Sequence, residues 1–304
     1  MKKLNVISAL SFLLVLLLSV FYFSCSKARI QTNSLKSYSP VNTYLDTKKQ
    51  QEQTFIIDST GKCPIVGNQG TKICSGKQCL MFPNGDSVTW PYIIKLVELY
   101  TPKDMIYYQM PTVASGTILK TDGEIRLRAF KNTTELVLKP SPCMAQIEMP
   151  CAAPQTGMHV FNGITTGGHP DWIDNSPVNL FSTTPNSYTA SITKLGWINC
   201  GQQVISSYTS TFAFTSATDD LTNVGIFIYI PATKTVMQVY GSSSGATSGA
   251  MPNGDAVKIV CIGIDASGNL FSFYQTQTVN PSTTISVTLS ATTDAALTTL
   301  LNGL

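Results

Sequence analysis

Residues 241–245 carry the one pattern in the chain that is typical of a catalytic nucleophile. They read GSSSG and match G-x-S-x-G, in which the central serine attacks a carbonyl from a sharp turn. That chemistry needs a strand before the turn, a helix after it and a histidine later in the chain. Here the flanking sequence is a Ser/Gly-rich loop, and no histidine follows His169. The sequence therefore disfavours a serine hydrolase.

The histidines and acidic residues also lack a catalytic arrangement. The two histidines, His159 and His169, do not form the H-E-x-x-H motif of zinc proteases. Residues 169–171 read His-Pro-Asp and favour a surface turn over a metal site. Acidic residues are scattered, so no carboxylate pair for glycoside hydrolysis can be assigned. We expect no enzyme activity, no catalytic residues, no metal and no cofactor.

Cysteines are more informative about structure than about catalysis. Cys25 is followed by Cys63, Cys74, Cys79, Cys143, Cys151, Cys200 and Cys261. This odd number leaves at least one thiol unpaired in a monomer, and an exported location permits disulfides. Cys74 and Cys79 flank a predicted hairpin loop and are predicted to pair. A zinc site made by Cys63, Cys74 and Cys79 is the alternative, disfavoured by its spacing and by an oxidising compartment.

The later cysteines give weaker expectations. If residues 144–149 form a straight strand, Cys143 and Cys151 lie roughly 26 Å apart at about 3.3 Å per residue, too far to pair. Cys200 and Cys261 stand among apolar strand residues. They are expected to be inert core thiols or a pair rather than nucleophiles.

The first 25 residues have the layout of an export signal. Lys2 and Lys3 precede an uncharged, mostly apolar run that ends in Ser24 and Cys25. A small residue before a cysteine resembles a bacterial lipoprotein signal, which predicts lipidation at Cys25. An uncleaved membrane helix is the alternative, since twenty apolar residues can span a bilayer. Residues 26–53 are polar and are predicted to be a flexible tether.

Composition favours an all-β exported protein. Charged residues make up 12% of the chain, whereas β-branched residues, Ser, Thr and Gly are abundant. Twenty Lys and Arg nearly balance 17 Asp and Glu, without a basic stripe. Nucleic-acid binding is therefore not expected. The chain is predicted to form two β-sandwich, immunoglobulin-like domains, at residues 54–155 and 156–304.

The clearest local patterns lie between residues 86 and 138. Residues 92–100 are apolar on both faces apart from Lys95 and Glu98, which predicts a central strand. Thr101 and the Pro-Lys-Asp that follows it predict a short helix with a side-chain cap. Residues 124–130 alternate apolar and charged side chains, which predicts a strand with one solvated face, and residues 131–134 turn it into a hairpin.

This region also resembles a known family. The run V-x-W-P-Y-x-I-K-L-V-E-L-Y-T-P-K-D-M-I from residue 88 is followed by M-P-T-x-x-S-G-x-I-L-x-T-D-G-E-I-x-L-x-A from residue 110, and residues 195–200 read LGWINC. Together they resemble a domain of Bacteroidota envelope lipoproteins. The resemblance implies an exported β-sandwich but supplies no established reaction. Gly201 and Gln202 stand where the family often has an acidic residue, so a role for that acid does not carry over.

The second half reads as a series of short strands. Strand patterns recur from residue 211 to 289, and Asp294 with Gly303 predicts a capped C-terminal helix. Residues 162–191 are predicted to form a long irregular connection. Its aromatic residues Trp172, Phe181 and Tyr188 would suit contacts with a partner, or they could tuck beneath the loop and hold it.

These observations predict an envelope lipoprotein, held in the outer membrane by its lipid and facing either the periplasm or the exterior. It would act as a structural or binding module for a protein or a glycan. The alternative is an envelope hydrolase whose residues come from distant strands. A deep cleft lined by carboxylates or histidine would favour the hydrolase, and aromatic surface loops would favour binding.

Overall fold

The computed structural model describes residues 34–304 except residue 62 and residues 175–178. Residues Leu35–Leu304 form one compact unit. Cys25 and the predicted signal segment lie outside the described residues, so lipidation stays a prediction. Within the described part of the chain, no helix has the length and apolar character needed to cross a membrane.

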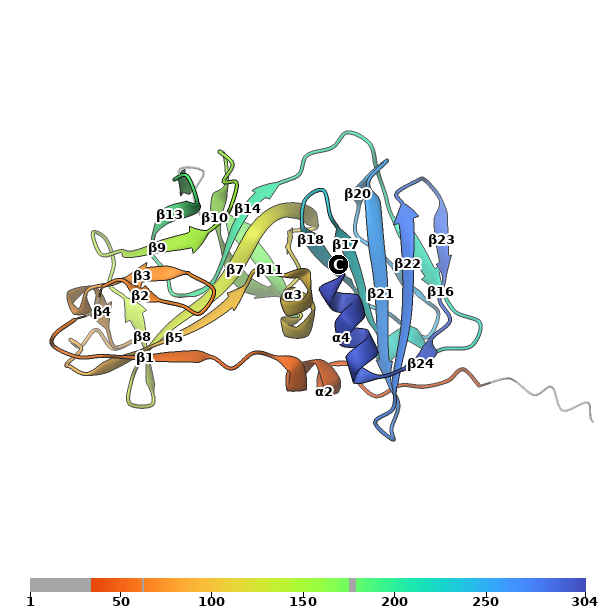
Figure 1. Cartoon of the computed structure of the whole chain (residues 1–304), viewed down its shortest axis with the longest axis horizontal. Coiled ribbons are helices and arrows are strands. Elements are labelled where there is room, and N and C mark those ends of the chain that lie inside the picture. Colours follow the sequence, from red (N-terminus) through yellow and green to blue (C-terminus); the bar gives the residue numbers. More distant parts are fainter. Residues whose placement is uncertain (1–33, 62, 175–178) are drawn as a thin grey trace, which may run out of the picture. The chain divides into compact units, whose positions relative to one another are not determined.

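A large sheet and a smaller one enclose the first core (Figure 1). The large sheet follows the order β1-β5-β7-β14-β10-β11, and β4, β6 and β8 attach beside β7. Its strands are β1 (Gln53–Ile57), β4 (Leu80–Met81), β5 (Tyr92–Leu99), β6 (Val113–Ala114), β7 (Thr117–Lys131), β8 (Thr134–Leu138), β10 (His159–Thr166), β11 (His169–Asp174) and β14 (Gly196–Gln203). The smaller sheet, in the order β12-β13-β9-β3-β2, comprises β2 (Ile65–Val66), β3 (Lys72–Cys74), β9 (Ala145–Pro150), β12 (Ser182–Thr183) and β13 (Ser187–Ile192).

The C-terminal half forms another pair of sheets around its own core. One sheet has the order β18-β17-β21-β22-β24, with β17 (Gly225–Ile230), β18 (Thr235–Val239), β21 (Ala256–Ile264), β22 (Leu270–Thr278) and β24 (Ser290–Thr292). The other consists of β16 (Phe212–Thr215), β19 (Ala246–Thr247) and β23 (Thr283–Ser286), and β15 (Thr209–Ser210) pairs with β20 (Met251–Pro252) nearby. Strand β17 is buried along its whole length, as its unbroken apolar sequence predicts.

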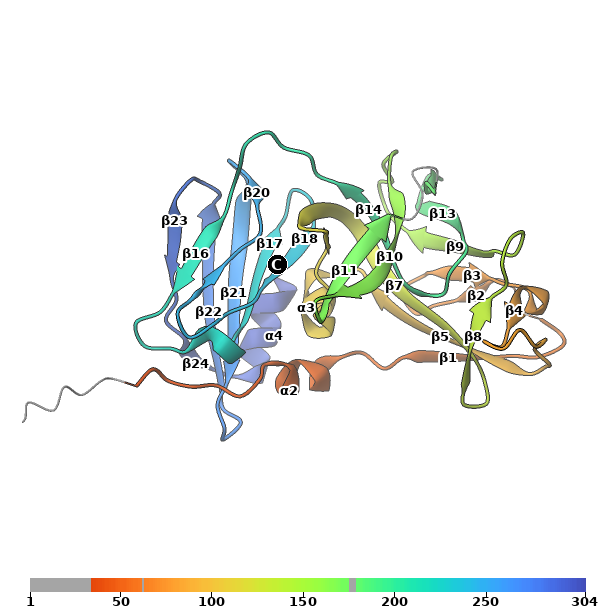
Figure 2. The ribbon, with the colours of Figure 1, turned by 180° about the vertical axis from the view of Figure 1, so that it is seen from behind.

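A third core lies between the large sheet and the β17–β22 sheet (Figures 1 and 2). Its side chains come from both sheets and from the helices α2 (Asn42–Leu45), α3 (Pro102–Tyr108) and α4 (Asp294–Asn302). Short 3₁₀ turns η1 (Asp46–Lys48), η2 (Lys77–Cys79) and η3 (Leu221–Asn223) complete the elements. Helix α3 begins as predicted, because the Thr101 hydroxyl accepts the Asp104 N–H at 3.2 Å and Pro102 is the first helical residue.

The all-β, sandwich-type fold is confirmed, but the predicted division at residue 155 does not separate the sheets. Strand β14 pairs with β7, placing Ile198 opposite Ile125, and β13 pairs with β9. Strands from both sides of residue 155 therefore belong to the same sheets. The Pro- and Cys-rich segment before residue 155 is a connection within the first pair of sheets, and the sheets change after β14. Because both pairs also share the third core, Leu35–Leu304 is one compact unit.

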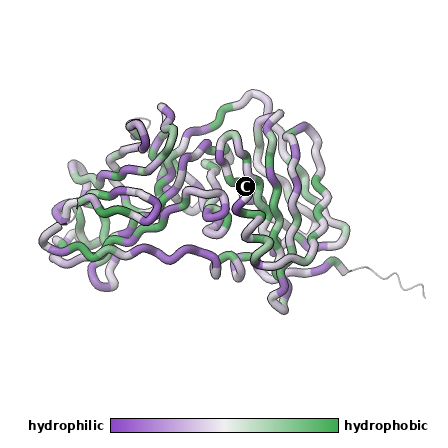
Figure 3. Tube along the Cα trace, in the orientation of Figure 1, coloured by the Kyte–Doolittle hydropathy of each residue, from purple (hydrophilic) through white to green (hydrophobic). Residues whose placement is uncertain are grey.

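The predicted tether over residues 26–53 is corrected from residue 36 onward. Lys36 and Ser39 form β-bridges with Asp219 and Ile264. Tyr38 is buried, and its hydroxyl donates to Asp219 at 2.6 Å. The polar composition concealed four apolar side chains that enter the cores: Tyr38, Val41, Tyr44 and Leu45. Among the described residues of this segment, the stretch that leads from η1 to β1 is the strongly hydrophilic connection that the sequence predicted (Figure 3).

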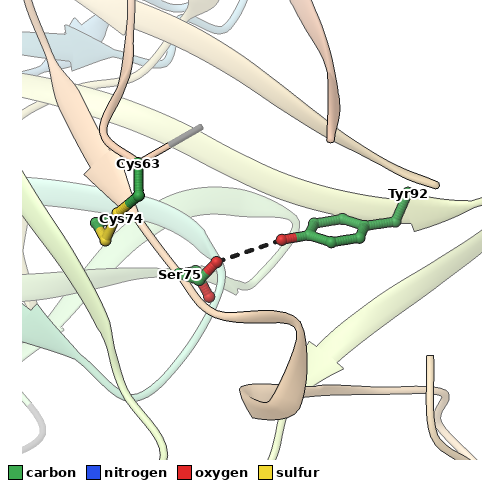
Figure 4. Close-up of a disulfide and its surroundings, with 4 residues drawn as sticks. All are labelled: Cys63, Cys74, Ser75 and Tyr92. Carbon is green, nitrogen blue, oxygen red and sulfur yellow. Dashed lines mark hydrogen bonds between the residues drawn. A yellow bond between two sulfur atoms is a disulfide. The ribbon is translucent and has the colours of Figure 1, made fainter. Parts of the chain in front are cut away.

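The predicted Cys74–Cys79 disulfide is wrong. Disulfides join Cys63 to Cys74 (Figure 4) and Cys79 to Cys143. Strand β3 pairs with β2 and β9, not with β4, so the hairpin on which the prediction rested does not form. The β2–β3 pairing brings Cys63 close to Cys74, with Cα atoms 5.1 Å apart. The β4–β8 pairing brings Cys143 close to Cys79, with Cα atoms 5.0 Å apart. The expectation that Cys143 and Cys151 do not pair is confirmed.

The predicted solvated face of residues 124–130 is wrong at its first residue. Glu124 is fully buried; its Oε1 accepts from Asn199 Nδ2 at 3.0 Å, and its Oε2 has no hydrogen-bond partner among the described residues. Burial raises the pKa of the Glu124 carboxyl well above its usual range, and the Asn199 hydrogen bond lowers it by less. Glu98 is equally buried but accepts N–H groups from Gln53, Gln69 and Thr71.

Glu124→Gln should stabilise the protein at pH 8 by about 1 to 3 kcal/mol, because the amide leaves one polar group unpaired as the carboxyl does but cannot ionise in this buried position. Since the pKa of Glu124 is raised in the folded state, its stabilising contribution is full below its unfolded pKa of about 4.3 and is lost as the pH rises through the folded pKa. Urea unfolding at pH 5 and pH 8 should show a smaller loss of stability in the variant than in the native chain.

Glu135→Gln is the matched control. Glu135 is exposed and bonded to Arg128, which lowers its pKa. Its substitution should not stabilise the protein at pH 8. Equal pH dependence in the native chain and in Glu124→Gln would contradict the assignment.

Candidate functional site

A cavity of about 230 Å³ lies where the tip of the β10–β11 hairpin meets β18. The residues that line it include Pro111, His169, Asp171, Met237, Gln238 and Tyr240. They come from chain positions more than a hundred residues apart. The cavity therefore exists only once the large sheet and the β17–β22 sheet are in contact.

The β10–β11 hairpin positions His169. Its two-residue turn, Gly167 and Gly168, has φ of +59° and +84°, values that favour glycine and suit a tight hairpin. The register then pairs Thr166 with His169. His169 is therefore the first residue of an edge strand, and the surface turn predicted for residues 169–171 is not formed.

Asp171 follows His169 by two residues on the same strand and lines the same cavity. Its Oδ1 accepts the backbone N–H groups of Ser115 and Trp172, each at 2.8 Å. Ser115 and Gly116 form the turn between β6 and β7, both with positive φ. This carboxylate oxygen therefore ties the β6–β7 turn to β11.

Thr112 fixes β18. The Thr112 N–H donates to the Val236 carbonyl oxygen at 2.8 Å, and the Val236 N–H donates to Thr112 Oγ1 at 2.8 Å. Farther along, the Thr235 hydroxyl donates to the Leu119 carbonyl at 2.6 Å. These bonds occupy the backbone N–H and C=O of Val236 on the outer edge of β18, two residues before Gln238.

Gln238 carries an unusual unsatisfied group. Its side-chain Oε1 is shielded from solvent and has no hydrogen-bond partner among the described residues, yet Gln238 lines the cavity. A buried amide oxygen without a donor typically lowers stability by about 1 to 3 kcal/mol. Because this oxygen is closed to solvent, its missing hydrogen bond lowers the stability of the fold and is not a contact open to a ligand in the cavity.

Tyr240 and His169 form an aromatic wall. Their ring centroids lie 3.7 Å apart at an interplanar angle of 31°, and Tyr240 stays 45% exposed. Burial of the rest of the side chain raises the pKa of Tyr240, which keeps its hydroxyl protonated at neutral pH. No lysine or arginine is among the described residues that line the cavity. Chemically, the site offers ring surface, the Asp171 carboxylate as an acceptor, and the hydroxyls of Thr166 and Tyr240, which can donate or accept hydrogen bonds.

The aromatic residues predicted as a binding loop are not a binding surface. Trp172, Phe181 and Tyr188 are 1%, 4% and 0% exposed. The segment is not one irregular connection either, because it contains strands β10 to β13. The rings hold the structure together: Phe181 packs edge-on against Tyr188 with centroids 5.9 Å apart, and the Trp172 indole donates to the Pro111 carbonyl at 2.7 Å. Trp172 thus supports the cavity from behind without being accessible to a partner.

A second cavity, of about 300 Å³, includes Tyr100, Asp122, Cys151 and Lys234 in its lining. Lys234 Nζ lies 2.5 Å from Asp122 Oδ1, and the Tyr188 hydroxyl donates to Asp122 Oδ2 at 2.6 Å. The charges of this cavity therefore satisfy each other. The bond between Lys234 and Asp122 holds the β17–β18 turn against β7. This structural role explains why the charged residues gather here without invoking a ligand.

The other sequence candidates are structural. Residues 241–245 form a tight turn in which Ser242 and Gly245 exchange backbone hydrogen bonds, and strand β19 follows instead of a helix. Cys200 and Cys261 are buried core thiols, and burial raises the pKa of each. Among residues 34–304 as described, no group of three or more His, Cys, Asp or Glu side chains is arranged to hold a metal ion.

Comparison with known proteins adds no assignment: no protein-family model, curated protein or solved structure matches the chain. The resemblance to envelope lipoproteins of Bacteroidota therefore stays a prediction.

Sequence reasoning missed Gln238 and Tyr240 and treated His169 only as a turn residue. One feature of the sequence could have pointed to Gln238. Residues 235–240 read TVMQVY, and a glutamine inside an apolar strand pattern has to find a partner when the strand is buried. The convergence of this strand with His169 could not be read from spacing.

Gln238→Leu should stabilise the ligand-free protein by about 1 kcal/mol, because leucine has a similar size and needs no hydrogen bond. Urea unfolding of the full chain measures this. Gln275→Leu, at a half-buried position of β22 outside the cavity, should change stability by less. Destabilisation of the Gln238 variant would show that its amide has a partner in the free protein.

Proposed function

We propose that this protein is an exported binding module, tethered to the cell envelope as an outer-membrane lipoprotein through Cys25. Its partner is a protein or a glycan, and it presents a small group of that partner to the cavity between β11 and β18. The observation that carries the binding proposal is the cavity of about 230 Å³ that is walled by the Tyr240 and His169 rings and lined by the polar side chains of Asp171 and Gln238.

Three features support this proposal. Disulfides at Cys63–Cys74 and Cys79–Cys143 fit an oxidising compartment outside the cytoplasm. The cavity combines apolar walls with a few placed polar groups, as binding sites for small groups do. An unsatisfied buried group is also expected where function is kept at the expense of stability.

The hydrolase alternative would need a nucleophile or an acid–base pair at the site. The cavity contains Asp171, but its Oδ1 is occupied by two backbone N–H groups. The cavity is therefore better suited to holding a group than to transferring a proton to it. The protein stays, in this proposal, a binding module rather than an enzyme.

Binding is tested by native mass spectrometry of the full chain equilibrated with a low-mass extract of the bacterial envelope. The native chain should retain a non-covalent adduct that is absent from Gln238→Leu and present on Gln275→Leu. An adduct retained equally by all three chains, or absent from all three, would contradict a site at Gln238. An adduct that is converted to smaller products would instead support the hydrolase.

The tether is tested separately by intact-mass analysis and membrane fractionation of the full chain. We expect a lipid mass on Cys25 and loss of Met1, with release of Cys25→Ala into the soluble fraction. A membrane-bound chain that keeps Met1 would contradict lipidation and leave a spanning N-terminal helix as the explanation.

A further inference from the structure

Strand β1 forms one edge of the large sheet (Figures 1 and 2). Among the described strands, β5 is the only one that pairs with its five residues. No other hydrogen bond within the described part of the chain reaches the backbone of Gln53–Ile57. The outer side of β1 therefore carries N–H and C=O groups with which a further strand can pair.

The sequence of β1 lacks the features that normally keep a strand edge from pairing, which are lysines, prolines and bulges. The opposite edge strand, β11, contains Pro170, which has no N–H to donate, and Asp171 ties that strand to the β6–β7 turn. In contrast, β1 reads Gln-Thr-Phe-Ile-Ile, without charge or proline, and its register with β5 is regular. β-branched and aromatic residues of this kind favour strand pairing.

The outward face of β1 combines an exposed apolar side chain with charges of both signs nearby. Ile56 is 72% exposed. Strand alternation places Thr54, Ile56 and Asp58 on this face, whereas the residues between them pack toward the first core. The register with β5 sets Thr54 opposite Lys95, so the Lys95 side chain lies on the same face.

The part of this face beside β1 has more positive than negative charge. The Glu52 carboxylate lies 3.4 Å from Lys95 Nζ and 3.1 Å from an Arg126 nitrogen. It also lies 3.9 Å from Arg128, whose guanidinium is bonded to Glu135. These three cations therefore share two carboxylates. Because the Lys95 side chain is 34% exposed, it can meet a further carboxylate that arrives along the β1 edge.

A second copy of the chain can supply that carboxylate in one register. Antiparallel pairing of two β1 strands about Phe55 would set Glu52 opposite Asp58 of the second copy, and like charges in opposite positions are destabilising. Pairing about Ile56 instead sets the two Ile56 side chains opposite each other and Asp58 opposite Thr54 of the second copy. Asp58 then lies two strands, about 10 Å between backbones, from Lys95 of the second copy, a gap that two extended side chains can bridge.

We propose that two copies of this protein associate through their β1 strands, paired antiparallel about Ile56, into one continuous sheet. The two Ile56 side chains shield each other from water, and Asp58 of each copy meets Lys95 of the other. Asp58 Oδ1 also accepts the N–H and hydroxyl of Thr60, and a carboxylate can keep these bonds while it meets a lysine. The inference goes beyond the proposed binding function, since no residue of β1 is among those described as lining the cavity at His169.

Native mass spectrometry of the full chain, released from detergent over a series of protein concentrations, tests the association. We expect a dimer that dissociates on dilution, because a single strand pair makes a small interface. Ile56→Lys should raise the dissociation constant by about tenfold or more, since like charges then meet at the twofold axis. Ile205→Lys is the matched control: Ile205 is 91% exposed in the β14–β15 connection, and its substitution should leave the dimer unchanged. Circular dichroism checks that both variants keep their sheets.

Charge exchange separates a contact between copies from one within a copy. Asp58→Lys and Lys95→Glu should each weaken its own dimer, because like charges then face each other at both Asp58–Lys95 positions. An equal mixture of the two variants should form a heterodimer, since every lysine again meets a carboxylate across the interface.

A native chain that stays monomeric at every concentration would overturn the proposal. So would a dimer that Ile56→Lys leaves intact, or an equal mixture of the charge variants that forms no heterodimer. A monomer whose β1 amides become protected from hydrogen exchange only after an envelope extract is added would also overturn it, and would assign this edge to a strand of another protein.

Discussion

The paired hydrogen bonds between Thr112 and Val236 are the interaction on which the arrangement of this protein depends. They join the outer edge of β18 to the segment that precedes β6, each at 2.8 Å. An uncovered strand edge invites association with other chains, and here the backbone groups of Val236 on that edge are bonded within the molecule. The same bonds bring the large sheet against the β17–β22 sheet, so the third core is shared, and the cavity opens beside this junction.

Buried polar groups near this junction differ in how well they are satisfied. Glu98 accepts several N–H groups and anchors β1 and the β2–β3 turn, so its burial is compensated. Glu124 has one oxygen without a partner among the described residues; it lies within the sheet, two residues from Asp122, and is not itself part of the lining of either cavity described above. Gln238 has an unpaired oxygen and does line a cavity. Because that oxygen is closed to solvent, the polar groups that the cavity offers to a ligand are others, among them the Asp171 carboxylate and the Tyr240 hydroxyl.

Local patterns in the sequence predicted local structure well. Thr101 and Pro102 located the start of α3, and the apolar run after Tyr92 located β5. Pairings between distant segments were not predictable in this way, because period-two alternation does not say which strand lies next to which. Strand β7 pairs with β14 about seventy residues later, which invalidated the boundary at residue 155, and the β2–β3 and β4–β8 pairings changed the disulfides. The site was missed for the same reason, since His169 and Gln238 meet only through the folded sheets.

The central claim is that the cavity beside Met237 takes a ligand from the envelope. Carbon-13 labelling of the methionine methyl groups tests it most directly, because Met237 lines the cavity and its signal can be assigned with Met237→Leu. Methyl NMR of the full chain, titrated with a low-mass envelope extract, should shift the Met237 signal saturably. The signal of Met149, buried in the first core, should stay in place. An unchanged Met237 signal at saturating extract, or equal shifts at both methionines, would contradict the account.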